Sequence, residues 1–236
     1  MTVPVLDPDL LSLLQRIDTP TVCNAIETAQ GRRGFEAFTR GTPFPTAPDE
    51  GAIVGYARTA TIQGARPPGE PPEVIRARRL DYFRQMAAGP RPAVAVIEDI
   101  DHPDCVGAWW GEVHVAIHKG LCLAGALTNG LVRDLGSLAE GFPVIAGAVG
   151  VSHGFVHVVE IGAPVAVMGL TVHDGDLVHA DRHGAVVIPA DVVAGLAVAL
   201  ARLEAAEAIV LTPAASADFD IDILLEAWSR FEAART

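Results

Sequence analysis

Hydrophobic residues recur at helical spacing near both ends of the chain, where apolar positions are three or four residues apart. Regularly spaced leucines mark the first N-terminal helix. The second starts at Thr19 and Pro20, residue types that favour a helix cap and the first helical position, and Gly31 is expected to end it. The helical segments predicted in this way are 7–17, 19–30, 191–210 and 223–236.

Between these ends the pattern changes to short apolar runs rich in β-branched residues, separated by glycine, proline and aspartate. Such runs predict strands, and the residues between them predict tight turns. Strands are expected within 51–64, 93–100, 121–127, 143–149 and 153–189, and helices within 73–89, from about 109–111 onward and briefly within 135–142. This order predicts one α/β domain over residues 1–236, with layered sheets and helical ends.

Composition narrows the possible functions. The chain has 236 residues and a formal net charge of −12, whereas nucleic-acid binders need clustered basic residues, so that class is disfavoured. No apolar run reaches the ~18 residues of a membrane helix, and the N-terminal segment lacks the basic region and cleavage site of a signal peptide. Three widely spaced cysteines fit a reducing compartment, so a cytoplasmic protein is expected.

The chain contains a single lysine, Lys119. Any Schiff-base mechanism would have to use it. Lys119 directly precedes Gly120, where a cation at the C-terminal end of a helix is a common structural choice. We therefore interpret Lys119 as structural and look for chemistry that needs no lysine.

One stretch in the middle of the chain gathers the residues with the clearest chemical potential. Glu112 stands at the start of a predicted helix and can move a proton. The N–H groups of Val113 and His114 have no partner within that helix and can hold a carboxylate. Arg133 offers a planar guanidinium to the same carboxylate. Asp134 beside it can hold Mg²⁺ or Mn²⁺ together with several waters.

Together these groups suit a 2-oxo acid. Arg133 and the backbone amides would take its carboxylate, and a divalent metal ion would stabilise the enolate that forms when a carbon–carbon bond breaks. The predicted reaction is retro-aldol cleavage or decarboxylation. The structural alternatives are an ordinary ion pair between Arg133 and Asp134 and a helix-dipole role for Glu112.

The spacing of Glu112, twenty intervening residues and Arg133-Asp134 resembles the RraA-like family. That family includes 4-hydroxy-4-methyl-2-oxoglutarate / 4-carboxy-4-hydroxy-2-oxoadipate aldolases and relatives of the regulator of ribonuclease activity A. The resemblance covers most of residues 18–210. Its further segments are DTPTVCNAI at 18–26, GYARTATI at 55–62 and GLTVHDGDLVHADRHGAVVIP at 169–189.

The resemblance implies an α/β/β swivelling-domain-like layered sandwich with helical N- and C-terminal segments. It implies a core of about 18–210 and a C-terminal helical extension of about 211–236. It also implies a homotrimer, or a dimer of trimers making a homohexamer, with each active site at a subunit interface. The expected partners are a small oxo-acid substrate and Mg²⁺ or Mn²⁺, with no nucleic acid and no membrane.

The resemblance also implies roles for individual residues. Arg133 would bind the pyruvyl carboxylate with the amides of the two residues after Glu112, and Asp134 would hold the metal ion. Glu112 stands where the aldolases have an aspartate that orders a metal-bound water. A glutamate from a late helix of the neighbouring subunit would complete the site, with Glu207 as the best match and Glu204 as the alternative.

Several alternatives stay open at this point. The chain can be a non-catalytic, protein-binding regulator, or it can run another enolate-type reaction on the same scaffold. Segment 64–92 is unlike the characterised aldolases, and its arginine-rich helix predicts a solvated face, with an anion-binding patch as the alternative. His114 and His118 are four residues apart, as in some zinc sites, but no third ligand follows, so packing is preferred. Asp99 ends a predicted strand and either lines the pocket or is a solvated loop acid.

Overall fold

The computed structural model describes residues 6–235, within which the chain forms two compact units. The first comprises Met1–Thr19 and Ala37–Ile188, and the second comprises Pro20–Glu36 and Pro189–Thr236. Residues 1–5 and 236, which belong to the N-terminal segment and to the last predicted helix, lie outside the described part. A single domain over the whole chain stays a prediction.

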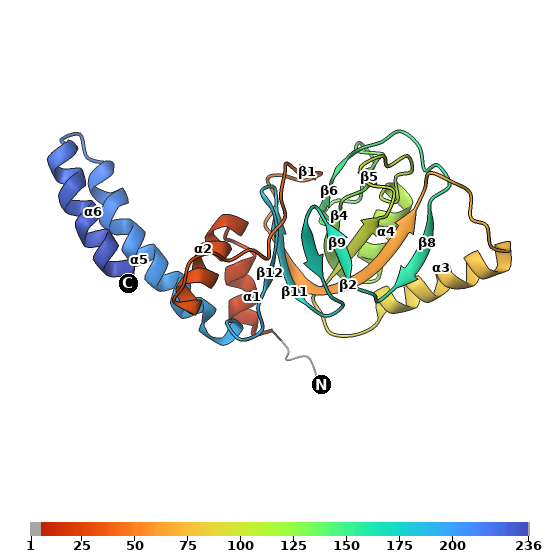
Figure 1. Cartoon of the computed structure of the whole chain (residues 1–236), viewed down its shortest axis with the longest axis horizontal. Helices are drawn as coiled ribbons and strands as arrows, with labels where there is room; N and C mark the ends of the chain where they lie inside the picture. The colour runs from red at the N-terminus through yellow and green to blue at the C-terminus, as the bar shows by residue number, and fades with distance from the viewer. Residues whose placement is uncertain (1–5, 236) are drawn as a thin grey trace. The chain divides into compact units, whose positions relative to one another are not determined.

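An eight-stranded mixed sheet forms the centre of the first unit (Figure 1). Its order is β1-β6-β4-β3-β2-β11-β12, and β8 also pairs with β2. The strands are β1 (Phe44–Pro45), β2 (Ile53–Gln63), β3 (Ala93–Asp99), β4 (Leu123–Thr128), β6 (Val144–Ala146), β8 (His157–Ile161), β11 (Leu177–Asp181) and β12 (Gly184–Ile188).

Strand β2 joins the parallel and antiparallel parts of this sheet. It pairs in parallel with β3, while β11 runs antiparallel to its first half and β8 antiparallel to its second half. The predicted strand within 51–64 is therefore one long strand. Strands β4 and β6 continue the parallel part, so the carboxyl ends of β3 and β4 meet at one edge of the sheet. In α/β folds, such an edge is where ligand sites usually form.

Alternating residues of β3 show what covers each face of the sheet. Ala95 and Ile97 pack into a cluster with residues of α3 and α4, whereas Val94 and Val96 pack into a second cluster with the β9–β10 hairpin. The covering elements are α3 (Pro72–Ala87), α4 (Glu112–Gly120), β9 (Val165–Val167) and β10 (Leu170–Val172). The layers are thus helix, sheet and hairpin, which confirms the α/β/β prediction.

The segment 135–142 forms turns, so the short helix predicted there is wrong. The N–H of Ser137 donates to the Asp134 carbonyl at 2.8 Å, and Phe142 is buried in the cluster beneath the helices. Contacts outside the segment therefore replace the regular bonds of a helix. The predicted strand at 143–149 is split at Gly147, because its second part, β7 (Ala148–Val149), pairs in parallel with β5 (Leu131–Val132).

Asp7 caps the N-terminus of helix α1 (Pro8–Leu14), because its carboxylate accepts hydrogen bonds from two N–H groups of the first turn. At Thr19, the backbone N–H donates to Asp181 and the hydroxyl lies 3.0 Å from Nδ1 of the buried His179. These contacts connect the end of the N-terminal segment to β11 within the first unit.

The second unit is helical. It contains α2 (Thr19–Gln30), the short 3₁₀ helix η1 (Val193–Gly195), α5 (Leu196–Ala214) and α6 (Ile221–Arg235). Helix α2 ends where predicted, because Gly31 has a φ of 64°. Helices α5 and α6 pack against each other, as the blue end of the chain shows in Figure 1. Across residues 6–235, every helix is too short or too polar to span a bilayer.

Candidate functional site

Helix α4 begins at the edge of the sheet where the parallel strands end. It connects β3 to β4, so its N-terminus lies on the same side as the carboxyl ends of both strands. Gly111 is its N-cap, and the Gly111 carbonyl accepts the first helical hydrogen bond from Val115 at 3.0 Å. Glu112 is therefore in the first turn, as predicted. Within residues 6–235, the N–H groups of Val113 and His114 have no hydrogen-bond acceptor, so they stay available to an anion.

The chain returns to this helix start after β4 and β5. Val132 forms an isolated parallel bridge with Trp110, and the N–H of Arg133 donates to the Trp110 carbonyl at 2.9 Å. Trp110 and Val132 are both fully buried, so this bridge is anchored in the core. It places Arg133 and Asp134 directly beside the first turn of α4, although they are more than twenty residues away in sequence.

The Asp134 carboxylate connects the two segments. One oxygen, Oδ2, accepts from the Glu112 N–H at 3.2 Å, and the other, Oδ1, accepts from Arg133 Nη1 at 3.2 Å. Asp134 adopts a φ of 58°, a left-handed conformation that is uncommon outside glycine. Such conformations cluster at functional sites, because only a constrained surrounding keeps them populated.

Gly111 is required for this arrangement. A Cβ atom at this position would lie 2.6 Å from Asp134 Oδ2 and 3.1 Å from Arg133 Cγ. Real Cβ atoms do not approach other atoms at 2.6 Å, so any side chain here would push the carboxylate away. The sequence showed only that Gly111 precedes Glu112. It did not show that the missing side chain of Gly111 makes room for the side chains of Arg133 and Asp134.

The ion pair between Arg133 and Asp134 is partly exposed. The two side chains keep 33% and 30% of their accessible surface, and Glu112 is exposed. Partly solvated pairs of this kind stabilise a fold by only about 0–1 kcal/mol. The ion pair alone therefore contributes little to the stability of this segment.

The imidazole of His114 lies beneath these charges and is neutral. Burial lowers the pKa of His114 to about 3, and the positive charges of Arg79 and Arg133 contribute to the lowering. Its ring centroid is 4.0 Å from that of Trp109, and its buried Nδ1 has no hydrogen-bond partner within residues 6–235. His114 thus contributes an uncharged ring near the helix start, in addition to its backbone N–H.

His118 has a packing role and does not pair with His114 around a metal ion. It is fully buried, and its Nδ1 donates to the His114 carbonyl at 2.6 Å. Since Nδ1 carries the proton, Nε2 is an acceptor, and it receives the Tyr82 hydroxyl at 2.6 Å. Both ring nitrogens are occupied, and burial lowers the His118 pKa to about 4.

Lowering the pH from 7 to 5 is expected to reduce the free energy of unfolding. Both histidines have folded pKa values below the ordinary 6.5, so the unfolded chain binds more protons between about pH 6.5 and pH 4. Stability is therefore complete above pH 6.5 and falls as the pH drops. For His118 alone the loss at pH 5 is about 2 kcal/mol. Urea titrations at the two pH values measure this difference.

The control is His118→Asn, which removes the titrating ring but leaves an amide that can still donate to the His114 carbonyl. The variant should be less stable at pH 7. Its loss of unfolding free energy between pH 7 and pH 5 should be smaller than that of the wild type by about 2 kcal/mol. An equally steep loss in this variant would mean that His118 is not the group responsible.

Asn129 and Asp99 join the ends of β4 and β3. The Asp99 N–H donates to Asn129 Oδ1 at 2.7 Å, and Asn129 Nδ2 donates to the Asp99 carbonyl at 3.1 Å. Asp99 is fully buried and burial raises its pKa, so the expectation of a solvated loop acid is wrong. Its hydrogen bonds support the turn that leads to Arg133. The role of Asn129 was not foreseen from the sequence.

Lys119 lies at the C-terminal end of α4, away from the helix start. Its Nζ donates to the Glu140 carbonyl at 2.6 Å, and the side chain is exposed. This contact agrees with the structural interpretation, because the ammonium group satisfies a carbonyl of the turn segment. Lys119 therefore does not join the charged groups at the start of α4.

Glu207 and Glu204 lie on α5, in the second compact unit. Glu207 is half-buried, whereas Glu204, one turn earlier, is exposed. The structure brings together Glu112, Val113, His114, Arg133 and Asp134 within one unit. A contribution from Glu207 of a neighbouring copy stays a prediction.

The residues at the helix start fit a hard divalent cation. Among residues 6–235, no three His, Cys, Asp or Glu side chains form a metal-binding group. Asp134 provides one carboxylate, and Mg²⁺ or Mn²⁺ commonly uses one or two carboxylates and completes its shell with water. Both hydrogen bonds of Asp134 are at the long end of the normal range, so its oxygens can turn to a cation at small cost.

Comparison with known proteins gives a family match over most of the chain. Residues 19–187 match the family model described as RraA-like, Aldolase/RraA. Protein DlpA of Legionella pneumophila is 30% identical over 107 residues, which are 43% of this chain and 17% of that protein. The chain therefore spans less than a fifth of the length of this curated relative.

Solved structures support the fold. A structure of an uncharacterised protein from Pseudomonas syringae pv. tomato has a TM-score of 0.72 and 19% identity, and the match covers 97% of each chain. Streptomyces coelicolor RraAS2, described as an unusual member of the RNase ES inhibitor RraA protein family, has a TM-score of 0.66 and 22% identity over 86% of this chain and 96% of its own. At these identities the likeness establishes the fold alone.

Proposed function

The chain belongs to the RraA-like family, which includes both aldolases and ribonuclease regulators, and from this premise we propose that it is a divalent-metal-dependent carbon–carbon lyase. Its substrate would be a small 2-oxo acid, cleaved by retro-aldol release of pyruvate or by decarboxylation of oxaloacetate. The observation that carries the proposal is the meeting of Arg133, Asp134 and free helix N–H groups at the start of α4.

Each group at the helix start has a distinct task. The Arg133 guanidinium binds the C1 carboxylate of the substrate, and the N–H groups of Val113 and His114 bind it from the helix side. Asp134 would hold Mg²⁺ or Mn²⁺ in the same place. When bound, that ion supplies positive charge that favours an enolate over the ketone. Because His114 is neutral, its ring adds no positive charge that would repel the ion.

The cleaved bond lies between C3 and C4 of the substrate. In the retro-aldol direction the C4 hydroxyl loses its proton, the C3–C4 bond breaks, and its electron pair remains as the enolate of pyruvate. In decarboxylation, CO₂ leaves from C3 and the same enolate forms. Protonation at C3 then gives the methyl group of pyruvate. Glu112 is exposed at the helix start, where it can accept or return these protons.

A second copy of the chain is part of the proposal. Glu112 is the only acid on the first turn of α4, and the two proton transfers at C4 and C3 are more easily served by two acids. Glu207 on α5 of a neighbouring copy is the proposed second acid, with Glu204 as the alternative. The assembly would be a homotrimer or a dimer of trimers.

The purified protein is expected to release pyruvate from oxaloacetate and from 4-hydroxy-4-methyl-2-oxoglutarate when Mg²⁺ or Mn²⁺ is present. A lactate dehydrogenase-coupled assay measures the pyruvate. The same protein should exchange the methyl protons of pyruvate for deuterium in D₂O, which NMR detects, because the reverse enolisation uses the same groups. EDTA should stop all three reactions.

The competing function is a protein-binding regulator without catalysis. A regulator would bind a partner in stoichiometric amounts and would show neither pyruvate release nor deuterium exchange with any divalent ion. Full activity in excess EDTA would also contradict the metal-dependent lyase. The free N–H groups and the left-handed Asp134 favour the lyase, since a protein-binding surface does not require them.

A further inference from the structure

Helix α6 carries a stripe of large apolar side chains on an exposed face. Ile221, Leu225 and Trp228 follow one another at intervals of four and three residues, which places them on one side of the helix. They keep 63%, 62% and 47% of their accessible surface, whereas Ala227 and Phe231 are buried. Since α6 already packs against α5, the stripe is a second face that a single copy of the chain leaves uncovered.

Trp228 is held in a fixed position on this stripe. Its indole Nε1 donates to the Glu232 carboxylate at 3.1 Å, and its ring centroid is 5.4 Å from that of the buried Phe231. The ring is therefore ordered although nearly half of its surface is exposed. A tryptophan that is ordered before binding loses little entropy when it enters an interface, and tryptophans are frequent anchors of such interfaces.

The surroundings of the stripe are acidic. Exposed acids outnumber exposed basic residues five to one within 215–234, where the acids are Asp218, Asp220, Asp222, Glu226 and Glu232 and the basic residue is Arg230. A partner for this face therefore needs an apolar surface that is accompanied by positive charge.

Helix α3, in the first unit, has the opposite charge. Four arginines lie within its 16 residues, and two of them form ion pairs with Glu70 and Asp81. The other two, Arg76 and Arg79, are exposed and have no carboxylate partner within residues 6–235. In a chain with a net charge of −12, these two arginines leave a local positive charge unneutralised.

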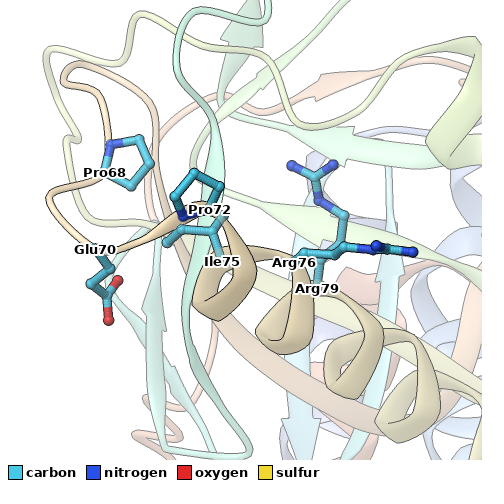
Figure 2. A pocket seen from close by; sticks show the side chains of 6 residues that line it. All are labelled: Pro68, Glu70, Pro72, Ile75, Arg76 and Arg79. Carbon is cyan, nitrogen blue, oxygen red and sulfur yellow. The ribbon is translucent and has the colours of Figure 1, made fainter.

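A shallow cavity of about 310 Å³ opens beside these two arginines. Figure 2 shows Arg76 and Arg79 extending from α3, and the apolar part of the lining is formed by Pro68, Pro72 and Ile75. Glu70 completes the lining, and its charge is compensated by its ion pair with Arg78. The cavity thus joins apolar side chains to two free guanidinium groups, which bind carboxylates and stack on aromatic rings.

We propose that Trp228 of one copy binds in the cavity beside Arg76 and Arg79 of a second copy, with the acids around the stripe facing these arginines. Charge complementarity identifies the second copy as the partner, because the acidic, apolar face of α6 matches the basic, apolar face of α3. The inference goes beyond the proposed function, which uses a neighbouring copy without assigning these surfaces. It gives the arginine-rich face of α3 an anionic partner, the alternative to a solvated face.

The proposed contact is head-to-tail, because the two surfaces that meet are different. Each copy offers its cavity to one neighbour and its Trp228 to another. Contacts of this kind continue from copy to copy until they close into a ring, and a homotrimer is one such ring. A contact between two identical surfaces would stop at two copies instead.

Trp228→Ala is expected to raise the dissociation constant of the assembly at least about 30-fold, the effect of losing an interface anchor. Arg76→Glu combined with Arg79→Glu should have the same effect, and both arginines are exposed, so this variant should fold. Sedimentation velocity over a range of protein concentrations measures the assembly, and circular dichroism checks the fold.

Two matched variants serve as controls. Val198→Ala shortens an apolar side chain on α5 that is 58% exposed, and Arg84→Gln removes an exposed arginine of α3 that is paired with Asp81. Both changes lie outside the proposed contact, so both variants should assemble as the wild type does.

Mixing the two defective variants tests the direction of the contact. The Trp228→Ala copy keeps an intact cavity, and the copy with Arg76→Glu and Arg79→Glu keeps an intact Trp228. An equimolar mixture should therefore form a complex of two copies through the one remaining contact. Sedimentation velocity with a fluorescent label on one variant detects this complex.

Several outcomes would overturn the proposal. A wild type that is monomeric, or a Trp228→Ala variant that assembles like the wild type, would show that Trp228 does not bind a second copy. A mixture that stays dissociated would show that Trp228 binds its own counterpart, its own chain or another protein. None of these readouts depends on the lyase reaction, so the two proposals stand or fall separately.

Discussion

Asp134→Asn is expected to abolish metal-dependent pyruvate release, by at least about 1,000-fold or ~4 kcal/mol of transition-state stabilisation. Asparagine removes the negative charge that would hold the cation. It tolerates the left-handed φ of 58° and keeps an oxygen that can accept from the Glu112 N–H. The change therefore removes chemistry while leaving the local backbone in place. The coupled pyruvate assay with added Mg²⁺ measures the effect.

Two measurements make this prediction specific. The free energy of unfolding should fall by no more than about 1 kcal/mol, because the ion pair with Arg133 is partly exposed. Asp218→Asn, at an exposed position in the second unit, removes the same charge elsewhere and should leave the activity unchanged. Substantial activity in Asp134→Asn would show that this carboxylate does not hold the metal ion.

Gly111→Ala is expected to lower the same activity about 10- to 100-fold without unfolding the protein. The new methyl group would lie 2.6 Å from Asp134 Oδ2, so the carboxylate must move, together with the nearby Arg133 side chain. The displaced atom is the end of a side chain, and Gly111 has an extended backbone that alanine also adopts. Misplacing a positioned group by about 1 Å is enough for a loss of this size.

Gly136→Ala is the matched control for that experiment. Gly136 lies two residues after Asp134, and a Cβ there meets no atom within 4 Å. This variant should have wild-type activity, and thermal unfolding should show that both variants fold. Full activity in Gly111→Ala would mean that the observed position of the Asp134 carboxylate is not the one that catalysis uses.

Most of the architecture could be predicted from residue patterns. The helices at both ends, the long strand β2 and the β-rich segment from β8 to β12 follow local periodicity and turn residues. The helix predicted within 135–142 was wrong, because the Glu140 carbonyl accepts from Lys119 and Phe142 packs into the core, and both are contacts with distant parts of the chain. Local propensity does not register such contacts, and tertiary packing overrides it.

The candidate site divides in the same way. Spacing and residue type singled out Glu112, Arg133 and Asp134, and the structure places the last two beside the N-terminus of α4. Gly111 and Asn129 were not recognised, since their roles depend on which atoms lie opposite them in space.

By itself, the sequence determined the composition of the site. It shows a carboxylate at a helix start, an Arg-Asp pair after twenty intervening residues and a single lysine placed elsewhere, and these follow from residue type and spacing alone. Only the tertiary structure decided which of them meet. The bridge between Trp110 and Val132, buried in the core, brings the Arg-Asp pair to the start of α4. Such contacts depend on burial and packing between distant segments, which no local pattern encodes.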